Sequence, residues 1–186
     1  MTFLKLVGLI YTVAQVLMPC LPPVPLSSEV LFTDQYLGKW YYIGVASWDD
    51  EDIESYKAVD NSVVELKKGE NNTLIMAGAL HQEDQCINVA WTYHVDPDLD
   101  PVMTEGLAEN IGVFLDGKWI KCPTCLIVAK LHPSNGFLRV MLFDRNEKTS
   151  ADLVKKFKSK MGCFFVIDRF FISPRTKDFC KLEGTE

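Results

Sequence analysis

The sequence predicts an all-β domain, either a sandwich or a closed barrel of about eight short antiparallel strands, with one α-helix after them. Three observations support this prediction. Short runs rich in β-branched and aromatic residues recur between residues 40 and 143. Turn-forming residues, such as the stretch Lys68-Gly69-Glu70-Asn71-Asn72, separate these runs. One amphipathic segment follows the last run, and no internal repeat or second domain is recognisable.

The fourth strand-like run shows the clearest alternation. Its odd-numbered positions are large and apolar, and they include Trp91 and Tyr93. Cys86 and its alternate neighbours point the other way, because successive side chains in a strand face opposite sides of the sheet. The eight predicted strands cover residues 40–47, 62–67, 73–80, 86–95, 102–106, 111–115, 125–131 and 137–143.

The helix is predicted between Ser150 and Gly162. Ser150 is a favourable N-cap, and Asp152 suits the positive end of the helix dipole. One apolar stripe at helical spacing would pack on the sheet, and it comprises Leu153, Val154, Phe157 and Met161. Gly162 is expected to end the helix, and the apolar run 164–172 is expected to form a further strand.

The N-terminus reads as a secretory signal. Residues 1–18 are almost entirely apolar or neutral, with Lys5 as the single charge. The apolar stretch is shorter than the ~20 residues that span a bilayer comfortably. We therefore expect a signal peptide over residues 1–20, either cleaved or retained as a hydrophobic anchor on a lipid surface, and one domain over residues 21–186.

Composition narrows the class of protein. The chain has 186 residues and a formal net charge of −6, which argues against nucleic acid as a partner. Six cysteines and an export signal point to an oxidising compartment, with about fifteen possible ways to form three disulfides. Cys122-Pro123-Thr124-Cys125 could be a redox pair or half a zinc site, but a simple disulfide is the favoured interpretation. Asn71-Asn72-Thr73 predicts a glycan on Asn71 in a hairpin turn.

No catalytic, cofactor or metal motif is recognisable. His81, His94 and His132 lie on different runs and lack ligand spacing. The acidic run 49–52 lacks the spaced ligands and the glycine of a calcium loop, so a solvated loop is expected there. We therefore expect neither enzyme activity, nor a cofactor, nor a metal.

Two motifs carry a family resemblance. Gly38-Lys39-Trp40 opens the first strand, and Leu142-Phe143-Asp144-Arg145 leads towards the helix. Together they resemble the lipocalins, which implies an eight-stranded up-and-down barrel with the helix packed on its outside. Trp40 would close the barrel floor, and Arg145 would lie over its ring as a cation–π contact.

Further segments resemble the apolipoprotein M family of lipocalins, among them Tyr36 to Tyr42, Trp91-Thr92-Tyr93-His94 and Thr104-Glu105-Gly106. This resemblance implies a secreted, extracellular lipid carrier that associates with high-density lipoprotein and binds a lipid such as sphingosine-1-phosphate. We expect the protein to be a monomer. It also implies disulfides between Cys20 and Cys163, between Cys86 and Cys180, and between Cys122 and Cys125.

The resemblance also implies which residues bind the ligand. Trp91 and Tyr93 match cavity positions, and Arg139, on a strand face shared with Phe143, matches a basic position. Val89 and Leu107 lie where mammalian members carry arginines, which would pair with a phosphate headgroup. Their absence favours a retinoid, a fatty acid or an uncharged sphingolipid as the ligand.

Two alternatives stay open. One is a freely soluble plasma lipocalin of the acid-glycoprotein type. The other is an isomerase that acts through a reactive cysteine inside the barrel. Cys86 argues against this alternative, because it faces away from the apolar stripe.

Overall fold

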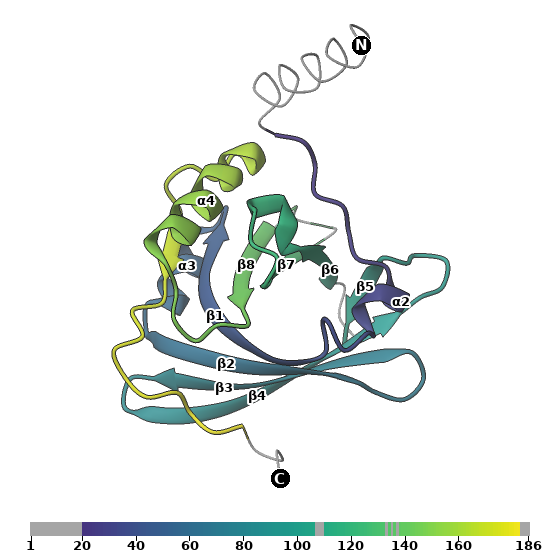
Figure 1. Cartoon of the computed structure of the whole chain (residues 1–186), viewed down its shortest axis with the longest axis horizontal. Coiled ribbons are helices and arrows are strands. Elements are labelled where there is room, and N and C mark those ends of the chain that lie inside the picture. Colours follow the sequence, from purple (N-terminus) through teal and green to yellow (C-terminus); the bar gives the residue numbers. More distant parts are fainter. Residues whose placement is uncertain (1–19, 107–109, 133, 135, 137, 183–186) are drawn as a thin grey trace, which may run out of the picture.

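The computed structural model describes residues 20–106, 110–132, 134, 136 and 138–182. Within them, each strand of the barrel pairs antiparallel with its neighbour in sequence, and β1 also pairs with β8, which closes the ring (Figure 1). A closed up-and-down barrel is therefore confirmed over a sandwich. The barrel strands are β1 (Gly38–Ser47), β2 (Val59–Lys68), β3 (Thr73–Gln82), β4 (Gln85–Val95), β5 (Val102–Glu105), β6 (Asn110–Asp116), β7 (Cys125–Leu131) and β8 (Leu138–Asp144).

Helix α4 (Ala151–Met161) packs on the outside of the barrel, as predicted (Figure 1). The Ser150 hydroxyl accepts a hydrogen bond from the Leu153 backbone N–H at 3.1 Å, which satisfies one of the free donors at the helix start. Leu153, Phe157 and Met161 are buried against the outer face of β1, β7 and β8.

The prediction for the segment after α4 is wrong in detail. Gly162 ends α4 as its C-cap, as predicted, but its backbone is right-handed (φ −55°) and the chain continues into the 3-10 turn η2 (Gly162–Phe164). Phe165 ends the turn in the left-handed region at φ 58°. The extended part is shorter than predicted and forms β9 (Phe170–Ile172), which pairs with β1.

Three short helical segments were not predicted. They are α2 (Ser28–Leu31), α3 (Asp50–Tyr56) and the 3-10 turn η1 (Gly117–Ile120). The expectation of a solvated loop at 49–52 is wrong, because Asp49 caps α3 and Asp52 is buried. Acidic residues in a first helical turn favour the helix because they face the positive end of its dipole.

The barrel floor is built around Trp40. Its ring is buried, and its Nε1 donates a hydrogen bond of 2.7 Å to the Tyr36 carbonyl. The guanidinium carbon of Arg145 lies 3.8 Å from the centre of the ring, the arrangement that the lipocalin resemblance implies. Gly38 has φ 88°, a conformation that a residue with a side chain rarely adopts.

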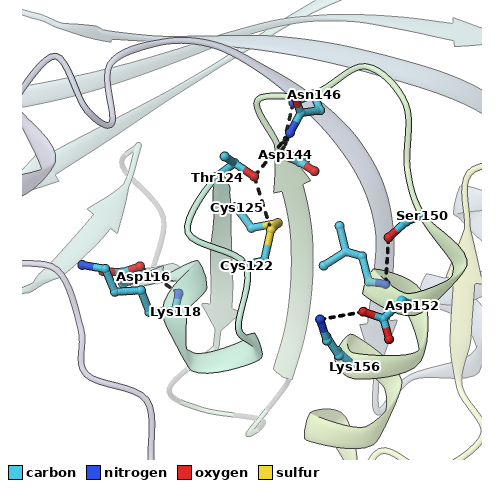
Figure 2. The surroundings of a disulfide bond; sticks show 11 residues. Asp116, Lys118, Cys122, Thr124, Cys125, Asp144, Asn146, Ser150, Asp152 and Lys156 are labelled. Atoms are coloured by element: carbon cyan, nitrogen blue, oxygen red, sulfur yellow. Dashed lines mark hydrogen bonds and ion pairs between the residues drawn. A yellow bond between two sulfur atoms is a disulfide. The ribbon is translucent and has the colours of Figure 1, made fainter.

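Three disulfides lie in the described part of the chain, and they join the cysteines in the pairs that the resemblance implies. They connect Cys20 with Cys163, Cys86 with Cys180, and Cys122 with Cys125, the last of which is drawn in Figure 2. The predicted signal peptide falls outside the described residues except for Cys20. None of the described helices is long and apolar enough to cross a membrane.

A C-terminal segment, residues 170–177, crosses the outside of the barrel between β1 and β2, and we call it the strap. β1 and β2 pair through four residue pairs, from Gly38–Leu66 to Tyr41–Val63. Beyond Tyr41, the strap bridges them: Ser173 N–H donates to the Ile43 carbonyl on β1, and Arg175 N–H donates to the Asp60 carbonyl on β2.

Candidate ligand-binding site

A cavity of about 200 Å³ lies inside the barrel. Most of its lining side chains are apolar or aromatic, and they come from β1, β2, β3, β4, β7 and β8 and from α3. The lining comprises Tyr42, Ser55, Tyr56, Val59, Ser62, Val64, Met76, Leu80, Gln82, Trp91, Lys130, Arg139, Met141 and Phe143. Ligand sites of about 300–1,000 Å³ are usual, so side chains must move to admit a large ligand.

Two ion pairs supply the charges at the cavity wall. The Arg139 Nε donates a hydrogen bond of 2.9 Å to Asp52 Oδ2, and Arg139 Nη2 contacts the other carboxylate oxygen. Lys130 Nζ donates to Glu105 Oε1 at 3.0 Å and lies 5.0 Å from the centre of the Trp91 ring. Each cation of the wall is therefore already matched by a carboxylate.

The surroundings shift the pKa values of these two cations in opposite directions. Burial lowers the pKa of Lys130, although Glu105 partly offsets this. Burial would also lower the pKa of Arg139, but the hydrogen bonds to Asp52 outweigh it and raise the value. Arg139 thus stays charged at any physiological pH, held by a carboxylate that is itself buried.

The hydroxyl of Tyr42 is buried at the cavity without a hydrogen-bond partner. Its ring stacks on Tyr56 with the ring centres 5.9 Å apart. Burial raises the pKa of Tyr42 well above that of a free phenol, so the group is a neutral donor. An unpaired buried hydroxyl is costly, and a ligand oxygen placed beside it would remove that cost.

Helix α3 forms one side of the cavity. Ser55 and Tyr56 contribute to the lining, while Asp52 reaches Arg139 on β8. On its outer side, Asp50 accepts a hydrogen bond of 2.7 Å from Arg169, next to β9. The helix is thus fixed to the barrel and to the segment before the strap by ion pairs, and Ile53 anchors it in the barrel core.

The structure brings three of the four predicted ligand residues together. Trp91, Arg139 and Phe143 line the cavity. Tyr93 lies deeper, fully buried in the barrel core, where its ring meets Phe114 with 5.3 Å between the ring centres. A side chain at Gly112 would collide with the Tyr93 ring, because its Cβ would lie 2.8 Å from Cε1. Val89 is half-buried, and Leu107 lies outside the described residues.

Sequence reasoning missed Lys130, Glu105, Asp52 and Tyr42. A signal for Lys130 was present, because Leu126 and Val128 on the same strand face lie in the barrel core. Nothing local marks Asp52, whose partner Arg139 is 87 residues away.

Asn71, the predicted glycan site, is exposed in the turn between β2 and β3. Asn71 and Asn72 both have positive φ, which suits the tight hairpin turn. Glycosylation at Asn71 remains a prediction.

A family model described as the ApoM domain matches residues 26–184.

The chain belongs to the apolipoprotein M family.

Two relatives illustrate the distance within the apolipoprotein M family. Apolipoprotein M of Rattus norvegicus is 25% identical over 155 residues, and apolipoprotein M of Mus musculus is 23% identical over 161 residues. Each alignment covers 81% of this chain and 78% of the relative.

Two solved siderocalin structures share the fold of this apolipoprotein M family member. The siderocalin Ex-FABP superposes with a TM-score of 0.63 at 17% identity, covering 80% of this chain and 100% of that chain. The siderocalin Q83 gives a TM-score of 0.63 at 18% identity, covering 79% and 93%. At these identities the likeness shows the fold.

Proposed function

We propose that the protein is a secreted carrier that sequesters a single-chain lipophilic molecule and catalyses no reaction. The observation that carries the proposal is an apolar cavity inside a closed barrel, with a small charged cluster at one side of its wall. Burial of ligand surface would supply most of the affinity, at ~25 cal/mol per Å² before ordering costs. The polar groups would orient the ligand.

The charges of the cavity wall bear on the headgroup. Arg139 and Lys130 each face a carboxylate, so a doubly charged phosphate would have to be buried without surplus positive charge. A retinoid or a fatty acid fits this wall better, since its head carries at most one charge and can accept from the Tyr42 hydroxyl. Sphingosine-1-phosphate remains the family-based candidate against which these are tested.

The proposed location is extracellular, on the surface of a lipoprotein particle. Three disulfides fit an oxidising compartment. The apolar residues 1–18 would provide the anchor if they are retained after export.

Mass spectrometry of the intact protein secreted by cells tests location and cargo together. We expect an N-terminus that includes residues 1–18 and one co-purified lipid per chain. A chain that starts after the apolar segment would remove the anchor and favour a freely soluble carrier.

Titration with retinol, retinoic acid and sphingosine-1-phosphate then tests the ligand class through quenching of Trp91 fluorescence. The Trp91→Phe variant is the matched control, because it should bind but lose most of the quenching. If none of the three lipids binds saturably, neither a retinoid nor sphingosine-1-phosphate is the cargo.

A further inference from the structure

Four large apolar side chains are exposed around Phe164, on the side of the barrel that α4 covers. Phe165 is 86% exposed, Ile167 73%, Leu21 52% and Trp48 43%. Soluble proteins scatter single apolar residues over their surface, but a group of this size at one place marks an interaction site.

Hydrogen bonds and a ring contact hold these residues in one place. Trp48 Nε1 donates to the Phe164 carbonyl at 2.8 Å, and Trp119 Nε1 donates to the Leu21 carbonyl at 2.9 Å. The rings of Trp119 and Phe164 meet edge to face, with 5.5 Å between their centres. The four exposed side chains therefore belong to segments that converge on Phe164, and we call them the Phe164 patch.

The N-terminal segment begins at the same place. Cys20 is bonded to Cys163, one residue before Phe164, and the apolar residues 1–18 precede it in the chain. In Figure 1 the chain from residue 20 passes beside the end of α4. A surface that binds the N-terminal segment therefore lies close to the Phe164 patch.

On its α4 side the patch adjoins positive charge, whereas the exposed acidic residues Asp49, Asp50 and Glu51 follow Trp48 on its other side. Residues 150–169 contain five cationic side chains, Lys155, Lys156, Lys158, Lys160 and Arg169, and two acidic ones, Asp152 and Asp168. Lys156 pairs with Asp152 at 2.6 Å, and Arg169 pairs with Asp50 at 2.7 Å. Lysines beside exposed aromatic and aliphatic side chains suit the interface of a phospholipid layer.

We propose that the Phe164 patch inserts into a phospholipid surface, with Phe165 and Ile167 reaching the acyl chains and the lysines of α4 contacting anionic headgroups. The inference rests on the proposed carrier function and adds a second membrane contact besides the N-terminal segment. Because Arg169 also holds Asp50 on α3, the docked surface lies next to the helix that lines the cavity.

The experiment uses the full chain with vesicles of phosphatidylcholine, alone or mixed with phosphatidylserine. In a Phe165→Trp variant, we expect a blue-shifted emission and quenching by brominated lipid when vesicles are added, read as the difference from the parent chain. Leu99→Trp is the matched control, because Leu99 is 50% exposed in the loop between β4 and β5. Unchanged emission of Phe165→Trp while the chain sediments with vesicles would overturn the proposal.

Affinity gives an independent readout. The double variant Phe165→Ser and Ile167→Ser should partition about tenfold more weakly onto vesicles, whereas Leu99→Ser should match the parent. Retinol binding without vesicles should be the same in all of these chains, so a defect there would concern the carrier function alone. Equal partitioning of the double variant and the parent would overturn the docking surface.

Discussion

At the scale of single residues, the Asp52–Arg139 ion pair joins α3 to the barrel wall. Asp52 is buried and Arg139 half-buried, so removal of the guanidinium leaves a carboxylate poorly solvated. Arg139→Ala should therefore lower the free energy of unfolding by about 1–3 kcal/mol in urea titrations.

The same substitution tests the ligand role of Arg139. If its charge anchors an acidic head, Arg139→Ala should weaken binding of retinoic acid more than binding of retinol. Pairing it with Asp52→Asn should restore part of the stability without restoring the preference for the acid. Equal losses for both retinoids would assign Arg139 to holding α3 rather than to the ligand.

Tyr42 and Tyr93 form a matched pair of buried phenols whose hydroxyls lack partners. Either substitution by phenylalanine should leave stability at neutral pH unchanged or raise it by up to about 1 kcal/mol, because no hydrogen bond is lost. Ligand affinity should fall in Tyr42→Phe alone, since Tyr42 lines the cavity and Tyr93 does not.

Alkaline titration checks the protonation of these phenols. Burial raises the pKa of both tyrosines, so above about pH 10 the unfolded chain releases protons that the folded chain retains. Stability must then fall as pH rises, and it should fall less steeply in either phenylalanine variant. An identical slope in all three chains would show that both phenols ionise normally.

At the scale of elements, the strap depends on Asp60 of β2. Its carboxylate accepts hydrogen bonds from Thr176 Oγ1 at 2.6 Å and from Lys177 N at 2.9 Å. Burial is the largest single influence on the pKa of Asp60 and raises it, but the hydrogen bonds to the carboxylate together outweigh burial and lower the pKa to about 2. The carboxylate thus fixes the strap through its charged form.

The pH dependence of the strap follows from that shift. The stabilisation by Asp60 is fully present above the normal aspartate pKa and is lost as pH falls through about 2. Asp60→Asn should be less stable than the parent at pH 7 and should converge with it in thermal melts towards pH 2. Asp178→Asn, exposed on the adjoining segment, should follow the parent at every pH.

Elements also show where sequence reasoning succeeds. The barrel strands and α4 were predicted to within a few residues, because period-two and helical patterns reflect burial on one face. Helix α3 was missed, since its acidic first turn looks like a solvated loop until Arg139 and Arg169 are placed beside it. Trp91 and Tyr93 share a strand face, yet only the three-dimensional packing distinguishes the cavity residue from the core residue.

At the scale of the whole molecule, the Cys20–Cys163 disulfide links residues 143 positions apart. Replacing both cysteines by serine should keep the barrel, whose cores are formed by other residues, and lower the free energy of unfolding by about 2–4 kcal/mol. Circular dichroism and urea titration measure the two effects. The variant should also bind vesicles more weakly, because the N-terminal segment is no longer held beside the Phe164 patch. A variant that binds as tightly as the parent would show that the two contacts act independently.

The short β1–β2 pairing has a consequence for how cargo leaves. Ten residue pairs join β3 to β4, whereas four join β1 to β2, three join β4 to β5 and four join β5 to β6. Among the described residues, β1–β2 is the short join that has cavity-lining residues on both of its strands, and beyond Tyr41 the strap fastens it. The wall of the cavity is expected to open first where its strand pairing is short. The bound molecule would then leave sideways between β1 and β2. Its residence time would be set by how long the strap stays attached rather than by the contacts inside the cavity.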